Sequence, residues 1–281
     1  MATAYATTHN LKLSFSTWVC PEWSVAAIVD GMQSYGYDGV ELRIGKGHKH
    51  NVDLETPADV LAGVRKQFDN ANMAISCIAT SYSFSAADAL ERAKTIAAVK
   101  QCLLLADSVG APYVRVFGGD IPHGLEVAGV IDYVAEALDE CTEYAETEKL
   151  RSMILIETQG AFSHSKYVSE VLSQVFSPKL GVLWDVLHPI RVLEQAEDTY
   201  DAICDHVRHV HVHDCTFNED RTKIQPCPPG EGFVPMPQVV EAIRAIGFTG
   251  YANLETDTHP GATVESDMRK NLAFVRGLMK G

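Results

Sequence analysis

Short apolar runs alternate with longer amphipathic segments along almost the whole chain. The runs that we predict as strands are Leu11–Ser16, Gly39–Arg43, Ala74–Ala79, Tyr113–Phe117, Met153–Glu157, Leu180–Asp185, Val207–Val212 and Tyr251–Glu255. Segments with a helical period follow them: Ser24–Ser34, Pro57–Asn70, Ala87–Ser108, Leu125–Glu148, Lys166–Phe176, Ile190–Cys204, Met236–Ile246 and Val264–Leu278. Eight strands that alternate with eight helices predict parallel pairing through right-handed crossovers.

Glycines support this division of the chain. Gly36, Gly110 and Gly247 each stand between a predicted helix and the next strand, where a glycine commonly ends a helix. An open, doubly wound sheet would have a glycine-rich phosphate turn after its first strand, but here that strand runs into STWVCPEW. We therefore predict an α/β fold, a single closed (β/α)8 barrel over residues 11–281, after a flexible N-terminal tail at residues 1–10. The long irregular stretch Asp214–Val234 is predicted to be a functional loop.

Composition restricts the partners and the compartment. The chain of 281 residues carries 37 acidic and 23 basic side chains, a formal net charge of −14, which disfavours nucleic acids and anionic membranes as partners. Its seven cysteines are widely spaced and form no CxxC pair, a pattern typical of reduced thiols. The first residues lack the features of a secretory signal, and no apolar stretch approaches the length of a membrane span. We expect a cytoplasmic protein and leave homo-oligomerisation open.

Four predicted strands end in strong metal ligands. Glu157, Asp185, His211 and Glu255 lie at or near the ends of the fifth to eighth strands. In such a barrel these strand ends meet at one mouth, where active sites lie. Three buried carboxylates beside one imidazole require a cation to balance them. The sequence therefore predicts a site for one divalent ion, with Mn²⁺, Mg²⁺ or Co²⁺ favoured by the oxygen-rich ligands and Zn²⁺ also compatible.

The chain resembles the xylose isomerase-like barrels, also called the sugar phosphate isomerase/epimerase superfamily. The resemblance extends from YDGVELR through SVGAPYVRVFGG to the final NLE, and the PGEG tract at Pro229–Gly232 is similar to the seventh loop of that family. It implies that the Glu, Asp, His and Glu of strands five to eight bind one divalent metal ion. It also implies a small-molecule sugar or keto-sugar as substrate.

Five further residues are predicted to contact substrate. His188 follows Asp185 by three residues and His213 follows His211 by two, so both can lie beside the metal; His188 could instead cap the helix that Pro189 begins. Side chains alternate between the two faces of a strand, and those of Arg115, Glu41 and Arg43 are expected to face the barrel interior. Arg115 could anchor a carbonyl or carboxylate, although a structural ion pair among these three residues is the alternative.

The resemblance does not select one branch of the family. His213 occupies a position where dehydratase relatives often carry lysine, and Gln159 one where some carry histidine. Ser163 and Phe217 stand where ketose 3-epimerases carry a glutamate and an arginine.

The acids flanking the metal suggest the reaction. Glu157 and Glu255 could remove and return a proton while the ion stabilises an enediolate, which gives sugar epimerisation or isomerisation. A dehydratase or lyase acting on a keto-sugar or keto-inositol through the same site is the first alternative, with His188 or His213 as the acid. An abasic-site DNA endonuclease is a weaker alternative, because the third and fourth predicted strands end in Ala79 and Phe117 rather than in metal ligands. A barrel that binds sugar without turnover would not need paired acids.

Overall fold

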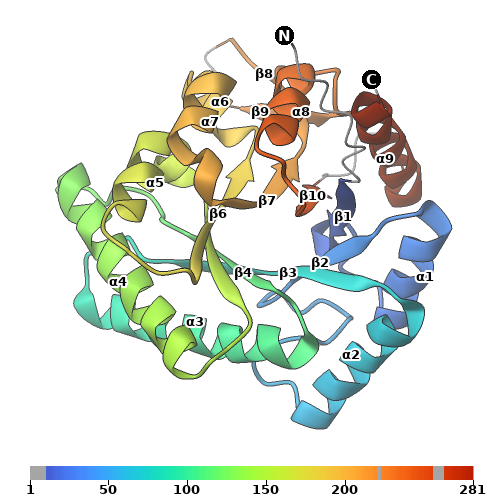
Figure 1. Cartoon of the computed structure of the whole chain (residues 1–281), viewed down its shortest axis with the longest axis horizontal. Coiled ribbons are helices and arrows are strands. Elements are labelled where there is room, and N and C mark those ends of the chain that lie inside the picture. Colours follow the sequence, from blue (N-terminus) through green and yellow to red (C-terminus); the bar gives the residue numbers. More distant parts are fainter. Residues whose placement is uncertain (1–10, 220–222, 256–262, 281) are drawn as a thin grey trace, which may run out of the picture.

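The apolar runs of the sequence form the eight parallel strands of a closed barrel with helices around it (Figure 1). The computed structural model describes residues 11–219, 223–255 and 263–280, so the predicted tail at residues 1–10 lies outside the described residues. Around the ring the strands follow the order β1-β10-β7-β6-β5-β4-β3-β2. Each strand therefore pairs with the previous barrel strand along the chain, which confirms the predicted (β/α)8 fold.

The barrel strands lie where the apolar runs predicted them, with one extension. Their bounds are β1 Lys12–Ser16, β2 Gly39–Arg43, β3 Ala74–Ser83, β4 Tyr113–Phe117, β5 Met153–Glu157, β6 Leu180–Asp185, β7 Val207–Val212 and β10 Tyr251–Leu254. The third strand continues beyond the predicted end at Ala79, because Ser83 still pairs with Phe117 after a register shift.

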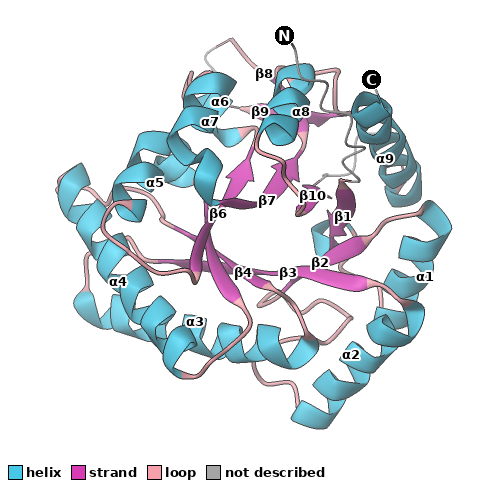
Figure 2. Ribbon diagram, in the orientation of Figure 1, coloured by secondary structure: helices cyan, strands magenta, loops and turns pink. Residues whose placement is uncertain are grey.

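Helices cover the outside of the barrel (Figure 2). The α-helices are α1 Val25–Tyr35, α2 Ala58–Ala71, α3 Ala89–Val109, α4 Val127–Thr147, α5 Ser165–Leu172, α6 His188–Arg191, α7 Ala196–Ile203, α8 Met236–Ala245 and α9 Val264–Lys280. Short 3-10 helices are η1 Thr17–Val19, η2 Gly160–Ser163 and η3 Cys204–His206. The predicted helix-ending glycines adopt left-handed backbone conformations, with φ of 87° at Gly36 and 80° at Gly110.

The single helix predicted over Ile190–Cys204 is wrong, because two helices occupy this region. The chain leaves α6 at Leu193, whose φ of 66° is incompatible with a continuing helix. The carboxylate of Glu194 then accepts hydrogen bonds from the Ser165 amide and the Thr199 hydroxyl. These contacts fix the break and tie it to the start of α5.

The stretch predicted as irregular contains an antiparallel hairpin. Its strands are β8 Asp214–Phe217 and β9 Ile224–Cys227, which pair with each other apart from the barrel. Because this hairpin follows β7, it stands at the mouth formed by the carboxyl ends of the strands. It therefore contributes to any site located there.

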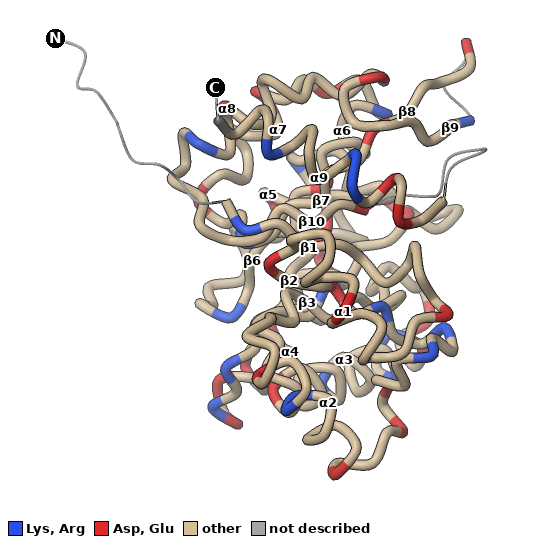
Figure 3. Tube along the Cα trace, turned by 90° about the vertical axis from the view of Figure 1, so that its right-hand side faces the viewer, with Lys and Arg blue, Asp and Glu red and all other residues tan. Residues whose placement is uncertain are grey.

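Charged residues are interspersed over the outer elements, as the Cα trace in Figure 3 shows. The barrel strands are mostly buried on both faces, as expected for a parallel sheet covered by helices. Within the part of the chain that the structure describes, no helix combines the length and apolar character needed to cross a membrane.

Candidate metal centre

The four predicted metal ligands converge at one mouth of the barrel. Glu157 and Asp185 are the last residues of β5 and β6, and Glu255 directly follows β10. The register pairs Asp185 with His211, and His211 with Asn253, so these strands end at a common level. One ligand atom from each of the four residues lies within 4.8 Å of the others.

The imidazole of His211 is the centre of this group. Its Nδ1 lies 2.9 Å from Oε2 of Glu255, 3.6 Å from Oε1 of Glu157 and 3.9 Å from Oδ2 of Asp185. The ring is fully buried, and Nδ1 makes no hydrogen bond of good geometry. Three carboxylates therefore face one nitrogen from different strands.

Histidines and carboxylates stabilise each other's charges in this group. Burial alone would lower the pKa of His211, but the charges of Glu41 and Glu255 raise it well above its usual value. Burial would likewise raise the pKa values of Asp185 and Glu255. Neighbouring histidines lower both instead: His213 and His188 act on Asp185, and His211 acts on Glu255. The lowered pKa values favour the ionised forms of Asp185 and Glu255, which are the forms that bind a cation.

The donor set fits a divalent ion. Three carboxylates and one imidazole provide the oxygen-rich ligation that Mn²⁺, Mg²⁺ and Co²⁺ favour and that Zn²⁺ accepts. The buried Nδ1 of His211, which lacks a hydrogen-bond partner among the described residues, also indicates an arrangement completed by a further partner.

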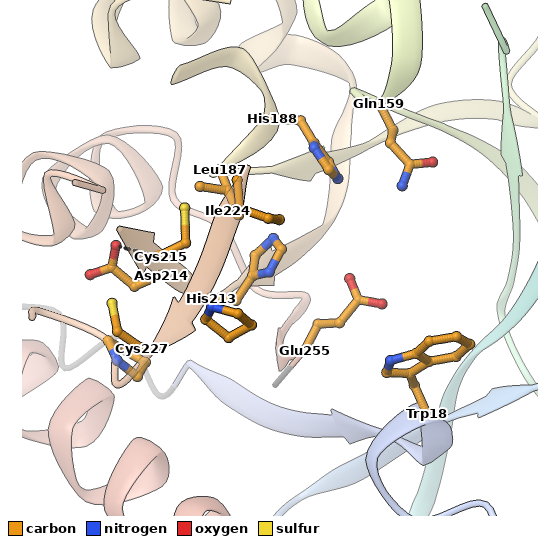
Figure 4. A pocket seen from close by; sticks show the side chains of 12 residues that line it. Trp18, Gln159, Leu187, His188, His213, Asp214, Cys215, Ile224, Cys227 and Glu255 are labelled. Carbon is orange, nitrogen blue, oxygen red and sulfur yellow. Dashed lines mark hydrogen bonds between the residues drawn. The ribbon is translucent and has the colours of Figure 1, made fainter. Parts of the chain in front are cut away.

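A cavity of about 180 Å³ opens beside this group (Figure 4). Its lining includes the apolar side chains of Trp18 and Leu187, three hairpin residues, Ile224, Pro226 and Cys227, and Pro229. Polar side chains from separate elements also line it: Gln159, His188, His213 and Glu255. Such a mixed surface suits a small polyhydroxylated molecule.

The residues predicted to contact substrate divide into two groups. His188 and His213 line the cavity, and Nε2 of His213 lies 2.9 Å from Oδ2 of Asp185. Arg115, Glu41 and Arg43 are buried and are not among the residues that line the described cavity. They lie in the barrel interior, as their alternation along the strands predicted, but do not reach the surface of this cavity.

Arg115 and Arg43 contact other residues of the same chain. Nε of Arg115 lies 3.2 Å from Oε2 of Glu157, and its guanidinium stacks on Phe117. Arg43 donates hydrogen bonds to the carbonyls of Ile44 and Ala79 and to the Ser81 hydroxyl, which lie in neighbouring segments of the barrel. Burial and the nearby charge of Arg115 lower the pKa of Arg43 to about 10.

Asp214 lines the cavity and organises the loop beside it, a role that the sequence did not reveal. Its Oδ1 accepts hydrogen bonds from the amides of Cys215 and Val234, and its Oδ2 accepts from those of Gly230 and Gly232. A Cβ on Gly232 would lie 2.2 Å from Oδ1 of Asp214, so the PGEG tract leaves room for the carboxylate. The sequence shows Asp214 and the glycine-rich PGEG tract, but it does not show that the amides of this tract surround the carboxylate of Asp214.

Comparisons with known proteins agree with this architecture. Residues 29–278 match the xylose isomerase-like TIM barrel family. Fructoselysine 3-epimerase of Shigella flexneri is 24% identical over 231 residues, which cover 79% of this chain and 82% of that protein. The crystal structure of D-psicose 3-epimerase with D-fructose has a TM-score of 0.79 at 17% identity, covering 96% of this chain and 100% of the other. The zinc-bound IolI protein has a TM-score of 0.81 at 16% identity, covering 96% and 98% of the two chains.

The family match covers most of the chain, and the structural matches share its fold over nearly the full length. The chain belongs to the xylose isomerase-like TIM barrel family.

Proposed function

We propose that this protein is a divalent-metal-dependent sugar epimerase or isomerase that acts on a ketose or a related polyol-ketone. The observation that carries the proposal is the convergence of Glu157, Asp185, His211 and Glu255 beside the cavity. The curated relatives are fructoselysine 3-epimerases, and D-psicose 3-epimerase shares the fold. The zinc atom in the IolI structure supports metal binding by this kind of barrel.

Glu157 and Glu255 are proposed as the proton-transferring pair. A divalent ion bound here would stabilise the negative charge that develops when a proton leaves the carbon next to a carbonyl. Glu255 lines the cavity, whereas Glu157 forms an ion pair with Arg115. One carboxylate removes the proton and the other returns one to the substrate, which inverts a carbon centre or shifts the carbonyl group to the neighbouring carbon without loss of atoms.

His188 and His213 are proposed to orient substrate hydroxyl and carbonyl oxygens. Both line the cavity on the same side as Asp185, with their ring centroids 6.0 Å apart. Neither needs to be a metal ligand for this role, because each ring has a nitrogen that can face a hydroxyl group.

A dehydratase or lyase remains the second candidate because the same two histidines could protonate a leaving hydroxyl group. A probable 3-DHS dehydratase shares the fold, with a TM-score of 0.76 at 18% identity. The endonuclease alternative has less support. Among the described residues, no group of candidate metal ligands includes a side chain from β3 or β4.

The decisive experiment follows ketoses and keto-sugars in D₂O by NMR. The metal-loaded protein is incubated with fructoselysine, D-fructose, D-psicose and D-tagatose. An epimerase produces a stereoisomer that carries solvent deuterium at the inverted carbon. Accumulation of an unsaturated product would instead assign the protein to the dehydratases.

Two variants test the proposed proton-transfer pair. Glu157→Gln and Glu255→Gln keep the size of each side chain but remove the base, so each should lower turnover by about 100-fold or more. Metal content is measured in parallel, because both residues are also proposed ligands. Glu241→Gln, at an exposed position on α8, is the matched control and should turn over normally. Normal turnover by either metal-loaded site variant would reject the two-base reaction.

A further inference from the structure

Glu41 is a fully buried carboxylate beneath the candidate metal centre. It extends from β2 across the barrel interior to β7, where its Oε2 lies 2.9 Å from Nε2 of His211 and 3.4 Å from Nε2 of His209. Its Oε1 has no hydrogen-bond partner among the described residues. Because Glu41 is absent from the cavity lining, a direct contact with substrate does not account for this arrangement.

The two nitrogens of His211 have different surroundings. Nε2 faces Glu41, whereas Nδ1 faces the carboxylates of Glu157, Asp185 and Glu255. A neutral imidazole has one protonated nitrogen and one lone pair. An ionised carboxylate only accepts hydrogen bonds, so it selects the form with the proton on Nε2 and the lone pair on Nδ1.

We propose that Glu41 is a positioning residue that makes Nδ1 of His211 the metal-binding nitrogen. This inference rests on the proposed metal centre and adds a residue that holds one of its ligands. A carboxylate behind a metal-binding histidine fixes the orientation of the ring and makes its free nitrogen a stronger donor. Glu41 occupies that position relative to the four clustered side chains.

His209 supports the same oxygen from one layer lower. It precedes His211 by two residues on β7, so both rings point inward and reach Oε2 of Glu41. His209 does not belong to the group of four ligands around Nδ1. Both histidines therefore lie near Glu41, but only His211 is a proposed metal ligand. A substitution of His209 is for this reason the matched control.

The test compares the zinc affinity of Glu41→Gln and His209→Gln with that of the unmodified protein. Glutamine at position 41 keeps the shape but removes the charge and the obligate acceptor, so zinc affinity should fall by about 10-fold to 100-fold. Glutamine at position 209 leaves Glu41 and its contact with His211 in place, so the zinc affinity of this variant should stay within about 3-fold of the unmodified protein. Melting curves without metal confirm that both variants are folded.

NMR of the unmodified zinc-loaded protein gives an independent readout. Long-range ¹⁵N–¹H spectra of labelled histidine should show the His211 proton on Nε2 and zinc on Nδ1. A proton on Nδ1 would overturn the proposal even if no variant folds. Unchanged zinc affinity of folded Glu41→Gln would also overturn it, while zinc binding by the unmodified protein would leave the metal centre intact. A protein that binds no zinc, manganese, magnesium or cobalt would overturn the metal centre itself, and this proposal with it.

Discussion

Replacing Asp214 with asparagine should loosen the loop that forms one side of the cavity. The carboxylate of Asp214 holds four backbone amides, two on each oxygen. In Asp214→Asn one oxygen becomes an amino group, so two of the four amides lose their acceptor in either orientation of the side chain. The remaining oxygen should stay with Cys215 and Val234, whose hydrogen bonds are the buried ones.

The cost follows from the two hydrogen bonds that are lost. Bonds to a charged acceptor contribute about 1.5–3 kcal/mol each, so the two together contribute about 3–6 kcal/mol. Water can reach the partly buried amides of Gly230 and Gly232, which places the expected loss near 3 kcal/mol. If the whole fold senses this loss, the melting temperature falls by roughly 6–12 °C.

The loop can also open while the barrel remains folded, in which case amide exchange is the more sensitive measurement. A loss of about 3 kcal/mol corresponds to roughly 100-fold faster exchange of the amides of Gly230 and Gly232. Ligand affinity should fall as well, because the hairpin contributes Ile224, Pro226 and Cys227 to the cavity.

Asp53→Asn is the matched control. Asp53 also accepts two backbone amides in a loop, those of Gly45 and Leu54, but it does not line the cavity. It should change neither exchange at Gly230 nor ligand affinity. The reasoning is refuted if Asp214→Asn leaves both the exchange rates and the unfolding midpoint unchanged.

Three further predictions concern the metal and its neighbours. Asp185→Ala should reduce the bound divalent ion from about one per chain to nearly none after dialysis, as measured by elemental analysis. Full retention of the ion would show that Asp185 is not a metal ligand. Because the pKa of His211 is raised in the metal-free protein, metal binding should release a proton, and affinity should increase with pH up to that raised pKa. Calorimetry in buffers of different ionisation enthalpy measures this release, and a pH-independent affinity would contradict it. Arg115→Met leaves the buried carboxylate of Glu157 without its cation and should destabilise the metal-free protein by about 3 kcal/mol or more in urea. Saturating metal should restore part of that stability, whereas a variant as stable as the unmodified protein would show that the ion pair is dispensable.

The sequence by itself determined the strands and the residues at their ends. Apolar runs of five or six residues and the glycines after helices are local signals, and strand parity follows from a period of two. Once eight parallel strands close into a barrel, residues such as Glu157 and Glu255 must share one mouth. The clustering of these four side chains therefore follows from the sequence pattern and the closed barrel.

Irregular segments were harder to predict, because their structure depends on contacts with distant residues. At the break in the predicted helix, Glu194 accepts hydrogen bonds from Ser165 of α5 and Thr199 of α7. Likewise, the segment after the hairpin is held by Asp214, which accepts hydrogen bonds from amides up to 20 residues further along the chain. Neither contact leaves a periodic pattern in the sequence.

Only the tertiary structure decided which inward residues meet. The alternation of side chains along the strands placed Glu41 and Arg115 inside the barrel. It did not show how deep along the barrel axis they lie or which residues of other strands they contact. In the closed ring only β1 and β10 separate β2 from β7, so Glu41 reaches His211 although the two residues are 170 positions apart. Strand pairing similarly sets Phe117 beside Glu157, and Arg115 turns to that carboxylate instead of the cavity. Long-range register and depth are properties of the closed barrel, which no local stretch of sequence encodes.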